Sequence, residues 1–238
     1  MSVPRFANPV FVALDTPDLA RALEIAAAVA PHVGGFKVGL EFLTAQGPSG
    51  VAKIVALGLP VFADTKFHDI PNTVAGAARA IGATGIGIFN VHASGGEAMM
   101  RAALDAASKF HPRPKIIGVT VLTSMSDADL GPIGQEGPLA DQVVRLAKLA
   151  RTSGLDGVVC SPREIAPVRE ACGPDFLIVT PGVRPAGAAL ADQRRVMTPA
   201  GAMKAGAGIL VIGRPITGAK NPAEAAKAIA SEIAGVAA

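Results

Sequence analysis

A short segment in the first third of the chain carries a dense group of residues capable of acid–base chemistry. The stretch ADTKFHDIPNTV contains Asp64, Lys66, His68 and Asp69 at the end of an apolar run. Side chains alternate along a strand, so Asp64 and Lys66 are expected on the same side, with Asp69 in the loop just beyond. A lysine between carboxylates stays protonated, because negative charge favours the ammonium form. The pattern therefore predicts a proton donor and not a nucleophile, which would need desolvation or a neighbouring cation. A purely structural network of ion pairs is the alternative.

Two further charged residues interrupt neighbouring apolar runs. Lys37 lies inside GGFKVG, and Asp15 ends PVFVALD. If the strands follow one another around a sheet, Lys37 can reach Asp64, which predicts an array of alternating Lys and Asp charges. Lys37 could instead extend its ammonium to solvent from the rim of the sheet. Asp15 could equally serve the turn LDTPD, since Asp and Pro favour turns.

The last two apolar runs each end in glycine and arginine. TPGVRP supplies Gly182 and Arg184, and VIGRPIT supplies Gly213 and Arg214. Glycine lets a backbone approach an anion closely, and arginine donates charge-assisted hydrogen bonds. The pair of segments predicts a phosphate site, although both glycines could simply form turns.

The remaining polar candidates carry weaker predictions. His92 ends the fourth run, and no second histidine stands at metal-ligand spacing beside it, so a hydrogen-bonded rim residue is favoured over a ligand. Thr123 and Ser124 end the fifth run and could bind a substrate carbonyl or cap a turn. Cys160 ends the sixth run without a base nearby, which disfavours a thiolate nucleophile.

All these residues stand at the ends of short apolar runs that alternate with Ala-rich stretches of helical length. Strands are predicted over 9–15, 34–39, 60–65, 84–91, 115–121, 156–160, 175–180 and 207–213. Helices are predicted over 18–30, 42–57, 73–82, 96–109, 139–153, 163–171, 198–205 and 222–236. Eight such units favour an α/β fold of the (β/α)8 TIM-barrel type over an open doubly wound sheet. No linker divides the chain, so a single domain over 1–238 is expected. In such a barrel, catalytic groups stand at the carboxyl ends of the strands.

Composition fits this fold and excludes several classes of protein. Of the 238 residues, 50% are apolar and 17% are charged, which disfavours disorder. The net charge of +3, without a Lys/Arg stripe, and the lack of Trp and Tyr argue against a nucleic-acid partner. The two cysteines have no CxxC spacing, which disfavours a disulfide framework or a zinc site. No secretion signal and no uninterrupted apolar stretch of about 18 residues is apparent, so a cytoplasmic protein with no membrane contact is expected.

The run DTKFHDIPNTV resembles the DxKxxDIPNT signature of the orotidine 5'-phosphate decarboxylases. The resemblance covers residues 10–217 and includes the segments VALD, FKVG, NVHASGG, VLTS, DGVVCSP, TPGVRP and GRPIT. Among these enzymes, the chain is similar to the bacterial form. It implies decarboxylation of orotidine 5'-monophosphate to uridine 5'-monophosphate in pyrimidine biosynthesis, by a homodimer with shared active sites and without metal or organic cofactor.

The resemblance also implies roles for individual residues. It places the catalytic array on Lys37, Asp64, Lys66 and Asp69, with Lys66 protonating C6 of the pyrimidine and Asp69 contributed by the second subunit. Substrate contacts would come from Asp15, Lys37, Asp64, Ile70, Thr73, Thr123 (or its neighbour Ser124), Arg184, Gln193, Gly213 and Arg214. In that set, ribose hydroxyls would be held by Asp15, Lys37 and Thr73. The pyrimidine edge would be bound by Thr123. The phosphate would be bound by Arg184, Gln193, Gly213 and Arg214. Gln193 lies in ALADQRRVMTP, a polar loop long enough to act as a lid.

Two alternatives remain open at this point. A relative resembling 3-keto-L-gulonate-6-phosphate decarboxylase or hexulose-6-phosphate synthase would share the Asp-x-Lys-x-x-Asp pattern but use Mg²⁺. The continuation from Ile70 to Thr73 argues against it. A non-catalytic barrel that binds a phosphorylated ligand is the other alternative, and a second buried lysine argues against it.

Overall fold

Eight short parallel strands form a closed barrel. The computed structural model describes residues 8–135, 137–185 and 197–235. The strands are β1 (Val10–Ala13), β2 (Gly35–Val38), β3 (Val61–Phe67), β4 (Ile88–His92), β5 (Lys115–Val119), β6 (Gly157–Val159), β7 (Leu177–Thr180) and β8 (Ile209–Ile212). Each pairs with the next in the chain, and β8 pairs with β1. The predicted (β/α)8 barrel is therefore confirmed.

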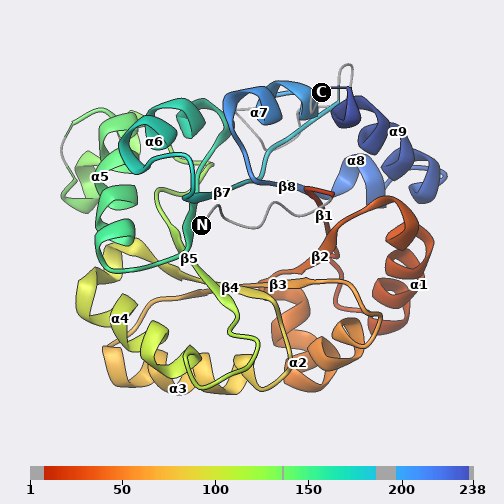
Figure 1. Ribbon diagram of the computed structural model, residues 1–238, viewed down its shortest axis with the longest axis horizontal. Coiled ribbons are helices and arrows are strands. Elements are labelled where there is room, and N and C mark those ends of the chain that lie inside the picture. The colour runs from red at the N-terminus through yellow and green to blue at the C-terminus, as the bar shows by residue number, and fades with distance from the viewer. Residues whose placement is uncertain (1–7, 136, 186–196, 236–238) are drawn as a thin grey trace.

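Helices surround the barrel and cover its outer face (Figure 1). They are α1 (Leu19–Val29), α2 (Leu40–Val55), α3 (Pro71–Gly82), α4 (Gly96–Ala107), α5 (Leu139–Thr152), α6 (Ile165–Cys172), α7 (Pro199–Ala205), α8 (Arg214–Thr217) and α9 (Pro222–Ala234). Short 3-10 turns are η1 (Ala30–His32), η2 (Ala93–Gly95), η3 (Asp127–Asp129), η4 (Gly131–Ile133) and η5 (Pro162–Glu164). Within the described ranges, none of the helices combines the length and the apolar character needed to cross a bilayer.

The strands pack apolar side chains on both of their faces, as the near-continuous apolar runs require. One buried cluster fills the interior of the barrel and consists of Phe11, Ala13, Phe62, Ile88, Ile117, Leu177, Val179, Ile209 and Val211. The alternate residues, such as Val12, Phe36 and Phe89, join the larger cluster shared with the helices. Because alternation fixes the face, Lys37 and Asp64 lie on the interior side, toward the carboxyl ends of their strands.

One glycine makes room for this interior packing. A Cβ atom on Gly35 would stand 2.5 Å from the ring of Phe11 and 2.5 Å from the carbonyl oxygen of Pro60. Both separations are too short for a side chain, so β2 contributes no bulk at this level. The interior then holds the Phe11 ring, and the next inward position of β2 is Lys37.

The structure corrects the predicted elements at their ends. Most strands are shorter than predicted, whereas β3 continues to Phe67. The register of β3 against β4 shifts between Ala63 and Phe67, so this end of β3 is not a regular strand. Helix α8, whose four residues begin after Gly213 at the end of β8, was not predicted. Helix α1 begins at Leu19, one residue after the predicted start, because Asp18 caps it: the Asp18 side chain accepts a hydrogen bond from the Ala20 N–H at 2.8 Å. A single domain over the whole of 1–238 stays a prediction.

Candidate active site

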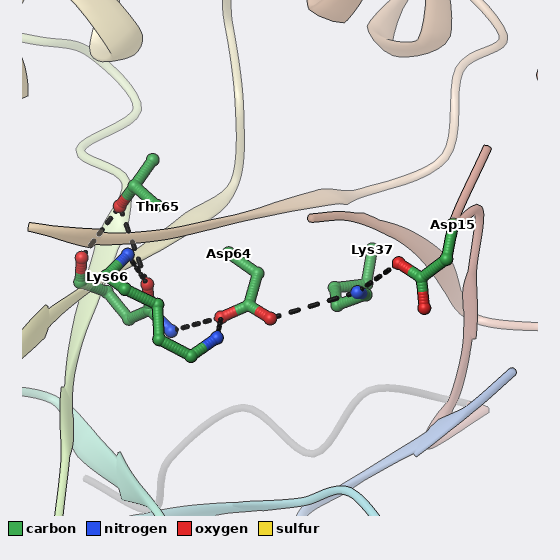
Figure 2. Close-up of polar contacts among 6 residues, drawn as sticks. Asp15, Lys37, Asp64, Thr65 and Lys66 are labelled. Atoms are coloured by element: carbon green, nitrogen blue, oxygen red, sulfur yellow. Dashed lines mark hydrogen bonds and ion pairs between the residues drawn. The ribbon is translucent and has the colours of Figure 1, made fainter. Parts of the chain in front are cut away.

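Four charged residues from three consecutive strand ends form a continuous line of contacts (Figure 2). The Asp15 Oδ1 lies 2.6 Å from the Lys37 Nζ, and the Asp64 Oδ2 lies 3.8 Å from the same nitrogen. The Asp64 Oδ1 lies 2.5 Å from the Lys66 Nζ. The structure thus brings together the alternating acids and bases that the sequence placed after β1, in β2 and in β3.

The array is more deeply buried at its centre than at its Asp15 end. The exposed fractions are 9% for the Lys37 side chain, 17% for Asp64 and 27% for Lys66, against 55% for Asp15. Ion pairs with this little solvent contact are weakly screened by salt. The two lysines therefore present fixed positive charge to whatever occupies the barrel mouth.

The Asp64 carboxylate is held in its ionised form. Burial by itself would raise the pKa of Asp64, but the charges of Lys66 and Lys37 and the hydrogen bonds from Lys66 and Asn90 outweigh it. The pKa of Asp64 accordingly lies below its ordinary value. Asp64 therefore acts as the shared counter-ion of both lysines at neutral pH.

Asn90 in β4 is a site residue that sequence reasoning missed. Its Nδ2 donates to the Asp64 Oδ1 at 2.6 Å, and its Oδ1 accepts from the Lys66 backbone N–H at 2.7 Å. The only sequence signal is a polar residue inside the apolar run GIFNV. Alternation puts Asn90 on the same face as Ile88, which faces the interior, and a buried amide there needs partners.

A cavity of about 160 Å³ opens beside the array. Its lining is Lys37, Phe62, Asp64, Lys66, Val119, Val121, Leu122, Thr123, Val159, Val179, Pro181 and Val211. Charge comes from β2 and β3, while β5 to β8 each contribute a valine. Val119, Val159 and Val179 are partners in register across β5, β6 and β7. The cavity can therefore hold a ligand with one charged and one apolar side.

Two histidines stack at the rim of the site. The rings of His68 and His92 lie 5.4 Å apart with an interplanar angle of 27°. Burial lowers the pKa of His92, and the charges of His68 and Lys66 lower it further, against an opposing effect of Asp64. His92 is therefore a neutral rim residue at physiological pH. Among the described residues no group of three or more His, Cys, Asp or Glu side chains could hold a metal ion.

The glycine–arginine segments lie at the ends of β7 and β8. Arg184 is 8% exposed, and its pKa is lowered by burial and then by the charge of Arg214, so the two guanidinium groups repel each other. An anion between them would relieve this repulsion. Gly182 has φ 75°, which supports the turn interpretation there. A Cβ on Gly213 would approach no atom closer than 3.5 Å within the described residues, so space alone does not require glycine.

The other predicted site residues fall in three places. Thr123 lines the cavity, while its neighbour Ser124 is exposed. Asp69, Ile70 and Thr73 are exposed on the loop after β3 and on the first turn of α3. The Asp69 Oδ1 accepts from the Ile70 N–H at 2.6 Å, and across the described ranges Asp69 forms no ion pair with a lysine. Gln193 lies outside the described residues.

A closed (β/α)8 barrel with a Lys–Asp–Lys array at the carboxyl ends of its strands defines an enzyme of the TIM-barrel class. The chain belongs to the orotidine 5'-phosphate decarboxylase / HUMPS family, whose model matches residues 8–229. The resemblance seen in the motifs is thereby confirmed.

Relatives and solved structures agree with this assignment over nearly the full chain. The orotidine 5'-phosphate decarboxylase of Moorella thermoacetica is 57% identical over 232 residues, covering 95% of this chain and 92% of the relative. The enzyme of the same name from Paramagnetospirillum magneticum is 52% identical, covering 95% and 98%. The crystal structure of orotidine 5'-phosphate decarboxylase from Lactobacillus acidophilus superposes with a TM-score of 0.85 at 40% identity, covering 95% and 99%.

Proposed function

We propose that the chain converts orotidine 5'-monophosphate to uridine 5'-monophosphate and CO₂, the decarboxylation step of pyrimidine biosynthesis, without a metal or organic cofactor. The observation that carries this proposal is the buried Lys37–Asp64–Lys66 array beside a largely apolar cavity. Preorganised positive charge in a poorly solvated site stabilises negative charge that develops on a substrate. Loss of CO₂ from a pyrimidine ring develops such a charge on carbon.

Lys66 is the proton donor in this proposal. The bond between C6 and the carboxylate carbon breaks, CO₂ leaves, and the electron pair remains on C6. The Lys66 ammonium transfers a proton to C6 and regains one from solvent, so atoms and charge balance. Its 2.5 Å contact with the Asp64 carboxylate supports this role, because that contact holds the ammonium beside the cavity that Lys66 lines.

The remaining predicted contacts divide the nucleotide between the ends of different strands. Asp15 and Lys37 would bind ribose hydroxyls, and the position of Thr123 on the cavity wall supports a contact with the pyrimidine edge. Arg184 and Arg214 would hold the phosphate, together with the backbone of Gly213 and the side chain of Gln193. The mutual repulsion of the two guanidinium groups supports an anion between them. Binding of a single nucleotide accounts for the cation excess without a nucleic-acid polymer.

We further propose a homodimer in which Asp69 and Thr73 complete the site of the partner subunit, with Ile70 beside them. Their exposure supports this, since Asp69 forms no ion pair with Lys37 or Lys66 in its own described chain. Ile70 is 67% exposed, a large apolar side chain at the start of α3 that a second copy would cover. A cytoplasmic location is also proposed, and Cys160 and Cys172, which are buried and not joined in a disulfide, are consistent with a reducing compartment.

The main rival is a Mg²⁺-dependent sugar-phosphate enzyme on the same barrel. Asp15 and Asp64 are already in contact with lysines, which leaves a divalent cation at these carboxylates competing with ammonium groups. We expect full conversion of orotidine 5'-monophosphate in the presence of EDTA, followed by the loss of absorbance of the orotate ring. Activity that vanishes in EDTA and returns on addition of Mg²⁺ would contradict the proposal and favour the rival.

Subunit mixing tests the shared site. Asp69→Ala and Lys66→Ala proteins should each be nearly inactive, whereas an equimolar mixture after subunit exchange should recover about a quarter of wild-type activity, because half of the dimers carry one intact site. A mixture of Lys66→Ala with Asp64→Asn is the control, since both residues belong to the same chain's site and no intact site can form. No recovery in the first mixture would show that Asp69 does not act across an interface.

A further inference from the structure

Asn90 lies fully buried in β4 and connects three groups of the adjacent strand β3. Its side-chain amide donates to the Asp64 Oδ1 at 2.6 Å and accepts from the Lys66 backbone N–H at 2.7 Å. Its backbone carbonyl accepts from the Thr65 hydroxyl at 2.7 Å. Asn90 therefore contacts the side chain of Asp64, the main chain of Lys66 and the side chain of Thr65 between them.

The backbone of Lys66 needs such an anchor. Lys66 has φ 51°, the only positive φ of a non-glycine residue within the described part of the chain. A residue with a Cβ atom rarely adopts this conformation, and it persists where surrounding contacts impose it. The register shift between Ala63 and Phe67 occurs at the same place. The Asn90 Oδ1 is the partner of the N–H that this irregular backbone turns toward β4.

We propose that Asn90 is a positioning residue that fixes the Asp64 carboxylate and the Lys66 main chain in the one geometry that brings their side chains together at the cavity. This inference rests on the proposed function, in which Lys66 donates the proton. Asn90 does not line the cavity, so it acts through Asp64 and Lys66 and not on the substrate. The Asn90 amide supplies both the donor and the acceptor that the two contacts require.

The first test compares two asparagines with the same kind of contacts. Asn90→Ala should lower kcat by about 100-fold, the loss expected from a displacement of the order of 1 Å, while KM stays within about threefold. Asn8 is the matched control: its amide donates to the His32 carbonyl at 2.7 Å and accepts from the Val10 N–H at 3.0 Å, before β1 and hence at the opposite end of the barrel. Asn8→Ala should keep kcat within about threefold. Equal losses in both variants, or an unchanged kcat in Asn90→Ala, would overturn the proposal.

A second variant, Asn90→Asp, tests the positioning role of Asn90 even if Asn90→Ala does not fold. Asn90→Asp keeps the acceptor for the Lys66 N–H but places a carboxylate against Asp64. Two such carboxylates share one proton when the pH falls, and the shared proton restores a donor between them. The charged and titratable groups facing Asp64 are Lys37 from β2, Lys66 from β3 and His92 from β4. The ratio of kcat for Asn90→Asp to wild-type kcat should rise at least tenfold between pH 8 and pH 5.5. A pH-independent ratio would contradict a role through the hydrogen bond to Asp64.

A measurement without turnover separates this inference from the proposed function. If the wild-type chain fails to decarboxylate orotidine 5'-monophosphate, the proposed function falls. The ¹³C resonance of the Asp64 carboxyl, assigned with Asp64→Asn, then still reports on Asn90. Its titration midpoint should move to higher pH in Asn90→Ala and stay unchanged in Asn8→Ala. An unchanged midpoint in both would overturn the positioning role whatever the activity.

Discussion

Replacing Lys66 with alanine is expected to lower kcat by roughly 10⁴-fold, because the variant loses both the proton donor and a positive charge beside the reacting carbon. The Lys66 side chain is 27% exposed, and its Nζ lies 2.5 Å from the Asp64 carboxylate, at the wall of the cavity. Steady-state turnover of orotidine 5'-monophosphate measures the loss.

Binding should survive this change. The Asp15–Lys37 contact at 2.6 Å and the two arginines after β7 and β8 do not depend on Lys66, so calorimetry with uridine 5'-monophosphate should detect binding. Lys53→Ala is the matched control, since Lys53 is exposed on α2 outside the site, and its turnover should equal that of the wild type. Turnover of Lys66→Ala within tenfold of the wild-type value is incompatible with a role as proton donor.

The second large effect is expected for Asp64→Asn, which removes the shared counter-ion of two lysines while preserving shape. We expect kcat to fall by roughly 10²- to 10³-fold, because the preorganised charges lose their fixed arrangement. Asp156→Asn is the matched control. Asp156 is 15% exposed, close to the 17% of Asp64, and pairs with Arg113 at 2.6 Å before β6, away from the cavity. Loss of this ion pair in Asp156→Asn should reduce the stability of the fold and leave kcat within about threefold of the wild-type value. Similar losses of kcat in both variants would indicate that Asp64 matters only for folding.

The same substitution has a signature in the pH dependence of stability. The folded-state pKa of Asp64 lies below the ordinary value of 3.8, so ionised Asp64 stabilises the fold above that value and the contribution is lost as the pH falls through the folded-state pKa. The difference in free energy of unfolding between wild type and Asp64→Asn should therefore be constant near neutrality and shrink in acid below pH 3.8. Urea denaturation at a series of pH values measures it. A difference that grows toward acid would contradict the assigned direction of the pKa.

Strand order and the contacts of Asp64 with Lys37 and Lys66 could be predicted because they follow from local patterns, whereas the contact of Asp15 with Lys37 was not predicted. Apolar runs such as VFVA and ILVI are long enough to mark β1 and β8, and placing β2 beside β3 brings Lys37 within reach of Asp64. Strand ends could not be predicted, because their position depends on the hydrogen bonds of the neighbouring strand. Helix α8 was missed for a different reason, since four residues carry too little periodicity to signal a helix.

The conformation of Lys66 shows where sequence reasoning stops. Alternation correctly put Lys66 on the side of Asp64, yet the backbone between them is not a regular strand. The contact that fixes it comes from Asn90, 24 residues further along the chain. A hydrogen bond between residues so far apart in the sequence cannot be predicted from the segment DTKF. The presence of an asparagine at position 90 does not by itself indicate which groups it will bind. Local patterns therefore indicate which side chains gather, and long-range contacts decide their geometry.

The valines that β5 to β8 contribute to the cavity have a mechanical consequence. Val119, Val159, Val179 and Val211 are β-branched, and such side chains have few accessible rotamers. Their side of the pocket is therefore stiff and cannot reshape itself around ligands of different width. On this side, the cavity therefore selects among ligands by a fixed shape. Any adaptation of the cavity to a bound molecule has to come from the connections that follow the strands.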